Sequence, residues 1–161
     1  MVEVTVVDTM MTHMHPPATA AIGGQPIHSM LAQFPTVCFT LTLFTDIVYW
    51  RTSYLMWQEF SSWLLLAGLV SGALALVAGV IAFLFSSAVR AAKPAWPHAI
   101  GGVIVLALAF LNSLAHARDG WIAVVPWGLI LSVATIIAMV ISNWLGRALV
   151  FHYGVGVRRH D

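Results

Sequence analysis

Long apolar runs separated by short polar segments dominate this chain. Four runs stand out, at Met30 to Trp50, Phe60 to Phe85, Ile100 to Ala115 and Trp121 to Val150. A hydrocarbon core about 30 Å thick needs about 20 helical residues, and the third run reaches that length when its flanking residues His98 and His116 are counted. Because lipid offers no hydrogen bonds to an open backbone, the runs are predicted to be helices and not strands.

The connections between the runs are short, so sequential neighbours are expected to be antiparallel. The predicted fold is all-α, an integral membrane four-helix antiparallel bundle with an extended N-terminal tail. Pro35 is expected to kink the first helix, because it lacks a backbone donor and crowds the preceding turn. The expected divisions are a tail over 1–27, a transmembrane domain over 28–157 with helices at about 30–50, 58–86, 98–117 and 121–151, and a basic C-terminal tail over 158–161.

Composition supports a membrane protein whose main partner is the lipid bilayer. Hydrophobic residues make up 60% of the chain and charged residues only 8%, which leaves too little polar surface for a soluble globule. The Lys and Arg residues are scattered and form no basic face, so no nucleic-acid partner is expected. We also find no nucleophile with a base in reach and no paired carboxylates, so the chain is not predicted to be an enzyme.

The basic residues predict the orientation, since cytoplasmic loops carry an excess of Lys and Arg. The side with both termini and the second connection holds five of them, and the other side holds two. These are Arg90, Lys93, Arg147, Arg158 and Arg159 against Arg51 and Arg118. We therefore expect a multi-pass protein of a bacterial inner membrane with both termini in the cytoplasm.

Polar residues at membrane depth are costly and are the main candidates for function. His28 and Asp46 are eighteen residues apart on the first predicted helix, and His98 and His116 have the same spacing on the third. Eighteen residues are five helical turns, or about 27 Å, so each helix carries a polar stripe with a titratable group near both ends. Antiparallel threading places His28, His98 and His152 near the cytoplasmic face, and Asp46, Asn112 and His116 near the opposite face.

Three hypotheses compete for the cytoplasmic histidines. In the first, His28 and His98 are axial ligands of a b-type haem between the first and third helices, with His152 as a substitute ligand. In the second, the three histidines bind a metal ion such as zinc or copper. In the third, they are interfacial residues that reach the headgroups or cap helix ends. For Asp46 the alternatives are an ion pair with Arg51, a hydrogen-bonded clasp between helices, or part of a proton or ion path.

The N-terminal tail contains a dense group of soft ligands. Met11, His13, Met14 and His15 form a thioether and imidazole cluster of the kind that suits copper or silver ions. The alternative is an accidental cluster in a flexible tail, because metal-binding tails usually repeat their motif and this one does not.

Three stretches resemble the bacterial membrane family known as domain of unknown function 2231. They are GGQPIHSMLAQFPTVCFTLTLFTDIVYW, FSSWLLLAGLVSGALALVAG and NWLGRALVFHYGVGV. The family pattern has a GHPxHPMLVxFP opening, a D-x-x-Y-W end to the first helix, a histidine opening the third helix and a WLGGELVYRHGVGV close. The resemblance covers Ile22 to Val157, and by position it matches His28, Asp46, His98 and, shifted by one residue, His152.

The resemblance implies a four-helix inner-membrane protein with no established activity, and relatives fused to Rieske or cytochrome domains suggest a redox setting. This chain departs from the pattern at several positions, namely Gln25, Ser29, Ala82, Gly102, Arg147 and Ala148. From these features together, we expect the protein to be a subunit or partner of a membrane redox assembly and to carry a b-type haem. A structural accessory subunit without a cofactor is the alternative, and a metal-ion binding or transport protein is the third.

Overall fold

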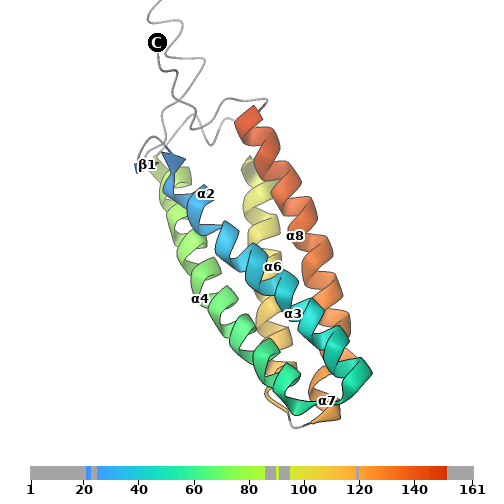
Figure 1. The fold of residues 1–161 in the computed structure, drawn as a ribbon. Helices are drawn as coiled ribbons and strands as arrows, with labels where there is room; N and C mark the ends of the chain where they lie inside the picture. The colour runs from blue at the N-terminus through green and yellow to red at the C-terminus, as the bar shows by residue number, and fades with distance from the viewer. Residues whose placement is uncertain (1–20, 23–24, 86–89, 91–94, 119, 152–161) are drawn as a thin grey trace, which may run out of the picture.

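The structure is a computed structural model, and it describes residues 21–22, 25–85, 90, 95–118 and 120–151. Four long helices dominate this part of the chain (Figure 1). The elements are β1 (Ala21–Ile22), β2 (Gln25–Pro26), α2 (Ile27–Leu31), α3 (Gln33–Thr52), α4 (Leu55–Phe85), α6 (Ala95–His116), α7 (Trp121–Val124) and α8 (Trp127–Phe151). β1 and β2 pair antiparallel over two residues each. The predicted all-α four-helix fold is confirmed, although the helix ends differ by a few residues from those expected.

Four segments are long and apolar enough to cross a membrane, and the first of them combines α2 with α3. The spans are Ile27–Thr52, Leu55–Phe85, Ala95–His116 and Trp121–Ala148. α3 packs against α4 and α8, and α6 packs against the same two helices, so α3 and α6 occupy opposite corners of the bundle. α3 and α6 run in one direction and α4 and α8 return (Figure 1). We call the end where α2 begins and α8 finishes the tail end, and the other the α7 end.

Two proline residues explain where the first and fourth segments depart from single helices. The break between α2 and α3 falls at Ala32, three residues before Pro35. Pro35 has no N–H to donate to the carbonyl of Leu31, so the regular ladder is interrupted there. The expectation of one continuous helix over 121–151 is wrong, because Val125 is extended, with φ −110° and ψ 126°. A residue before proline disfavours the helical region, and Pro126 follows.

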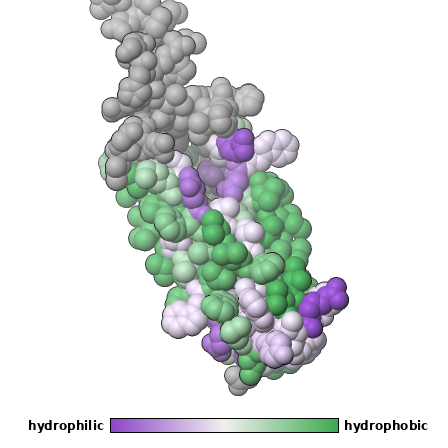
Figure 2. All heavy atoms as spheres, in the orientation of Figure 1, coloured by the Kyte–Doolittle hydropathy of each residue, from purple (hydrophilic) through white to green (hydrophobic). Residues whose placement is uncertain are grey.

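An apolar core fills the middle of the bundle between its two ends. It contains Phe39, Leu65, Val105, Ala109 and Met139. Large apolar side chains are also exposed along all four long helices, and on the face shown in Figure 2 they form broad green areas. Such an apolar outer surface is what contact with lipid chains requires.

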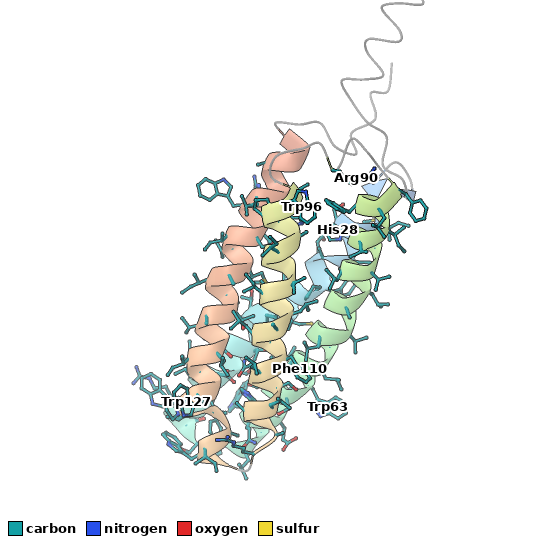
Figure 3. All side chains as sticks on the ribbon, turned by 180° about the vertical axis from the view of Figure 1, so that it is seen from behind. His28, Trp63, Arg90, Trp96, Phe110 and Trp127 are labelled. Carbon is teal, nitrogen blue, oxygen red and sulfur yellow. The ribbon has the colours of Figure 1, made fainter. Side chains whose placement is uncertain are left out.

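Tryptophans mark both ends of the apolar surface. Trp63 and Trp127 lie toward the α7 end and Trp96 lies at the tail end, with Phe110 between these levels (Figure 3). All three tryptophans are exposed. Aromatic side chains favour the two interfaces of a membrane, so their positions are those expected of a spanning bundle.

Glycines on α4 let the neighbouring helices approach closely. A Cβ atom added at Gly68 would lie 2.4 Å from Phe39 Cε1, and one at Gly72 would lie 2.6 Å from Leu106 Cδ2. Neither distance is possible between real atoms. α4 therefore receives a side chain of α3 at one glycine and a side chain of α6 at the other, as small-residue packing predicts.

Replacing Gly68 with valine should destabilise the bundle by about 1–3 kcal/mol, because Phe39 cannot give way without disturbing the core. Gly102 is the matched control, since a Cβ there would meet nothing within 4 Å. Unfolding of both variants in detergent, followed by circular dichroism, measures the difference. Equal stability of Gly68→Val and Gly102→Val would contradict this packing.

Candidate functional site

At the tail end of the bundle, the side chains of His28 of α2 and His98 of α6 meet. Their Nε2 atoms are 3.5 Å apart. The ring centroids are 5.7 Å apart and the ring planes are nearly perpendicular, at 81°. Because the centroid distance exceeds the nitrogen distance by almost twice the radius of an imidazole ring, the two rings meet end to end through Nε2.

The other nitrogen of each ring fixes the protonation pattern. His28 Nδ1 lies 2.7 Å from the carbonyl oxygen of Ala75, and His98 Nδ1 lies 2.9 Å from that of Ser142. A carbonyl oxygen only accepts, so both Nδ1 atoms must carry and donate a proton. In the neutral rings both Nε2 atoms are then unprotonated, and their lone pairs point at each other.

Two opposed lone pairs repel each other unless a cation lies between them. The 3.5 Å separation is longer than the usual range of about 2.7–3.2 Å for a direct hydrogen bond from nitrogen. A metal-bound histidine typically donates its other N–H to a backbone carbonyl, which orients the ring and makes the free nitrogen a better ligand. Both rings already have that arrangement, which is chemically suited to holding a cation through Nε2.

Glycines on the returning helices provide room for both rings. A Cβ atom at Gly79 of α4 would lie 2.9 Å from His28 Nδ1, and one at Gly146 of α8 would lie 2.9 Å from His98 Cε1. Any side chain at either position would push the imidazole away from its carbonyl partner. The two glycines are therefore part of what positions the histidines.

A second polar cluster lies inside the α7 end and centres on Asp46 of α3, whose side chain is fully buried. One carboxylate oxygen, Oδ1, accepts from Ser61 Oγ of α4 at 2.5 Å and from His116 Nε2 of α6 at 2.9 Å. The other, Oδ2, accepts from Ser132 Oγ of α8 at 2.5 Å. One carboxylate thus joins all four spanning helices.

His116 completes the charge balance of this cluster. Its Nδ1 donates to the carbonyl oxygen of Asn112, one turn earlier, at 3.0 Å. One proton lies between His116 Nε2 and Asp46 Oδ1, so the pair as a whole is electrically neutral. A neutral, hydrogen-bonded pair avoids the large cost of a single charge buried in the bundle.

Asn112 links the cluster to α8 but leaves one atom without a partner. Its Nδ2 donates to Ser132 Oγ at 2.8 Å. Its Oδ1 is buried and has no hydrogen-bond partner within the described part of the chain. Buried polar atoms of this kind commonly bind an ordered water.

The structure brings His28 and His98 together, as the threading predicted, and pairs Asp46 with His116. Arg51 is not the partner of Asp46, because its guanidinium lies over the Trp50 ring, 5.0 Å from the centroid. Of the alternatives for Asp46, the clasp between helices is the one that the structure contains. His152 and the tail residues Met11, His13, Met14 and His15 lie outside the described residues.

Sequence reasoning missed Ser61 and Ser132, which donate to the carboxylate from α4 and α8. Serines are common in membrane helices and usually bond to their own backbone. The one feature that could separate these two serines from others in the spanning helices is their depth in the membrane, which is close to that of Asp46.

Comparisons with known proteins identify one family. The family described as "Predicted membrane protein (DUF2231)" matches residues 24–159. No curated protein and no solved structure gives a significant match.

Replacing Asp46 with alanine should reduce the free energy of unfolding by about 3–5 kcal/mol, because it leaves His116 without its partner and frees the donors of α4 and α8. Arg51→Ala should change stability by no more than about 0.5 kcal/mol, since that side chain is exposed. Unfolding in detergent, monitored by circular dichroism, compares the two. A large effect of Arg51→Ala, equal to that of Asp46→Ala, would refute the four-helix clasp.

Proposed function

Because the chain belongs to the DUF2231 family of predicted membrane proteins, whose description names no activity, we propose its function from its own site. The protein is an integral membrane protein, and we propose that it holds a b-type haem between His28 and His98. In this proposal it acts as a subunit or partner of a membrane redox assembly. A bound haem supplies one-electron chemistry, and the protein contributes the ligands and their surroundings.

The observation that carries the proposal is the end-to-end meeting of two Nε2 atoms whose rings are both anchored through Nδ1. His28 and His98 would hold the iron of a haem, because imidazole nitrogens are common ligands of haem iron. Here the ligands come from α2 and α6, and the flanking helices α4 and α8 present glycines beside the rings.

The charge of the surroundings also favours haem over a bare divalent ion. Among the residues that the structure describes, the only acidic ones are Asp46 and Glu59, and both belong to the α7 end. A divalent ion on two neutral imidazoles would leave two uncompensated positive charges in a low-dielectric bundle, which is costly. The porphyrin ring carries two negative charges, which cancel the two positive charges of ferrous iron.

Arg90 is a suitable partner for the carboxylates of a haem. It lies at the same end of the bundle as His28 (Figure 3). Its Nη1 donates to the carbonyl oxygens of Phe83 and Leu84, which anchors the side chain at the end of α4. A guanidinium has five N–H donors, so donors remain for an acidic group at this face.

A bare metal ion is the second candidate, and the nitrogen separation favours it. Metal–nitrogen bonds of about 2.0–2.1 Å place two opposed ligands about 4 Å apart, and ligands at a tetrahedral angle closer together. The observed 3.5 Å is close to what a bare ion needs, and small rotations of the two rings would accommodate one. A haem would require more, because α4 and α8 contact the rings at Gly79 and Gly146 and would have to move away as well. His152 was expected to supply a third ligand to such an ion.

A transport function has less support. The apolar core of Phe39, Leu65, Val105, Ala109 and Met139 separates the histidine pair from the Asp46 cluster, and an ion or proton path needs polar groups through the full depth. A purely structural accessory subunit would need no cation between the imidazoles. The orientation with both termini cytoplasmic, inferred from the basic residues, would place the histidine pair at the cytoplasmic face of a bacterial inner membrane.

An absorption spectrum of the protein purified from membranes in mild detergent tests the proposal. We expect a Soret band and an α band that sharpens on reduction, with about one haem per chain. His28→Ala and His98→Ala should each lower the bound haem at least about 10-fold, whereas His152→Ala should retain it. Glu59→Gln, a change at an exposed residue near the opposite end of the bundle, serves as a control and should retain the haem.

Metal analysis of the same samples separates the candidates. Iron with the haem spectrum supports the first, and zinc or copper at one equivalent without it supports the second. A protein that contains neither, even after expression with added haem precursor and metals, would leave only the structural role.

A further inference from the structure

The bundle consists of two helical hairpins that are related by an approximate two-fold axis. Hairpin 1 comprises α2 to α4 (27–85), and hairpin 2 comprises α6 to α8 (95–151). His28 meets His98 and Asp46 meets His116, and in each pair the two residues are 70 positions apart. Residues that touch their own counterparts lie on the symmetry axis. Because the two pairs lie at opposite ends of the bundle, the axis runs along its length.

Further contacts repeat between the hairpins. In each, the histidine donates to a carbonyl of the returning helix, and the glycine one turn further along that helix faces the ring. These residues are His28, Ala75 and Gly79 in hairpin 1, and His98, Ser142 and Gly146 in hairpin 2. The serines of the Asp46 cluster do not follow this repeat, since Ser61 and Ser132 both donate to Asp46. Parallel repeats about an axis along the membrane normal are a known way of building membrane proteins.

The two ends of the axis differ in one decisive respect. At the tail end the paired residues are identical, so the contact would be the same between any two hairpins. At the α7 end the paired residues are complementary, because a carboxylate of hairpin 1 meets an imidazole of hairpin 2. Only the second contact can distinguish a mixed pair of hairpins from a pair of the same kind.

We propose that each hairpin is a separate assembly unit, and that the Asp46–His116 pair makes hairpin 1 select hairpin 2 over a second copy of itself. Two copies of hairpin 1 would bring two buried carboxylates together on the axis. Two copies of hairpin 2 would bring together two imidazoles, each with Nδ1 committed to a carbonyl. A polar pair that is satisfied in one pairing and unsatisfied in the others is a standard means of specificity.

The proposal concerns pairing and holds whether or not a haem or metal ion is bound at the histidine pair. Its consequence for the intact protein is that hairpins of two copies in a crowded membrane can exchange, but only as mixed pairs. Hairpin 1 is therefore specific for a second hairpin whose imidazole lies opposite the carboxylate of hairpin 1.

A cleavage and exchange experiment on the full-length chain tests this. A protease site is inserted in the connection between α4 and α6, and two preparations are made with different N-terminal tags, one of them also tagged at the C-terminus. After cleavage in mild detergent the preparations are mixed, and the N-terminal tag of the preparation without a C-terminal tag is pulled down. Recovery of the C-terminal tag reports exchange of hairpin 2, and recovery of the other N-terminal tag reports pairs of hairpin 1 with itself.

We expect the hairpins to stay together after cleavage, and mixed pairs to exceed hairpin 1 pairs at least about 100-fold, because like charges across an interface are strongly disfavoured. Asp46→Asn should raise the recovery of hairpin 1 pairs at least about 10-fold, since two asparagines can hydrogen-bond to each other. Glu59→Gln, an equal charge change at an exposed acid of α4, should not change it.

Either of two results would overturn the proposal. One is dissociation of the cleaved wild-type hairpins under conditions in which the uncleaved chain stays folded. The other is the same exclusive mixed pairing in Asp46→Asn as in the wild type. If uncleaved Asp46→Asn is not helical and monodisperse, His116→Asn makes the corresponding test on pairs of hairpin 2, with a different C-terminal tag on each preparation.

Discussion

The buried carboxylate of Asp46 is the constraint on which the rest of this structure depends. A charged group inside a bundle that faces lipid cannot be solvated by water, so its hydrogen bonds must come from the protein. Here they come from α4, α6 and α8, while α3 carries the carboxylate itself. The donors fix how far each helix is shifted along its neighbours. Apolar packing alone would define that shift less strictly, because lipid competes equally well for apolar side chains.

The histidine pair at the tail end follows the same symmetry and has the opposite consequence. Asp46 and His116 are a carboxylate and an imidazole that hydrogen-bond to each other, whereas His28 and His98 are identical and, when both rings are neutral, both present an unprotonated Nε2. The polar groups at one end of the axis are therefore paired with each other, whereas the other end is where we propose that a cation binds. This difference is the physical reason why we propose a structural role for the Asp46 cluster and a binding role for the histidine pair, with the apolar core between them.

Much of this arrangement could be predicted from the sequence, because four apolar runs and short connections permit few topologies. The threading correctly gathered His28 with His98, and Asp46 with His116, at opposite ends. The partner of Asp46 was harder to choose, since Arg51 is one turn away and His116 is 70 positions away. The serine donors could not be identified, because nothing local separates them from serines that bond to their own helix.

The break at Val125 was missed, since Pro126 is also compatible with the first turn of a helix. The repeat between hairpin 1 and hairpin 2 involves only a few polar residues and glycines. The apolar residues between them do not repeat, so the sequence alone does not indicate it.

The most direct test of the central claim is a distance measurement across the axis in a lipid bilayer. Solid-state NMR of the protein with ¹³C-labelled aspartate and ¹⁵N-labelled histidine reports whether His116 Nε2 and the Asp46 carboxyl carbon are directly hydrogen-bonded. The account predicts a strong dipolar coupling between these two nuclei, and its disappearance in Asp46→Asn labelled in the same way. A His116 ring that shows no coupling to Asp46 in the wild type would contradict the four-helix clasp, and with it the register that brings His28 and His98 together.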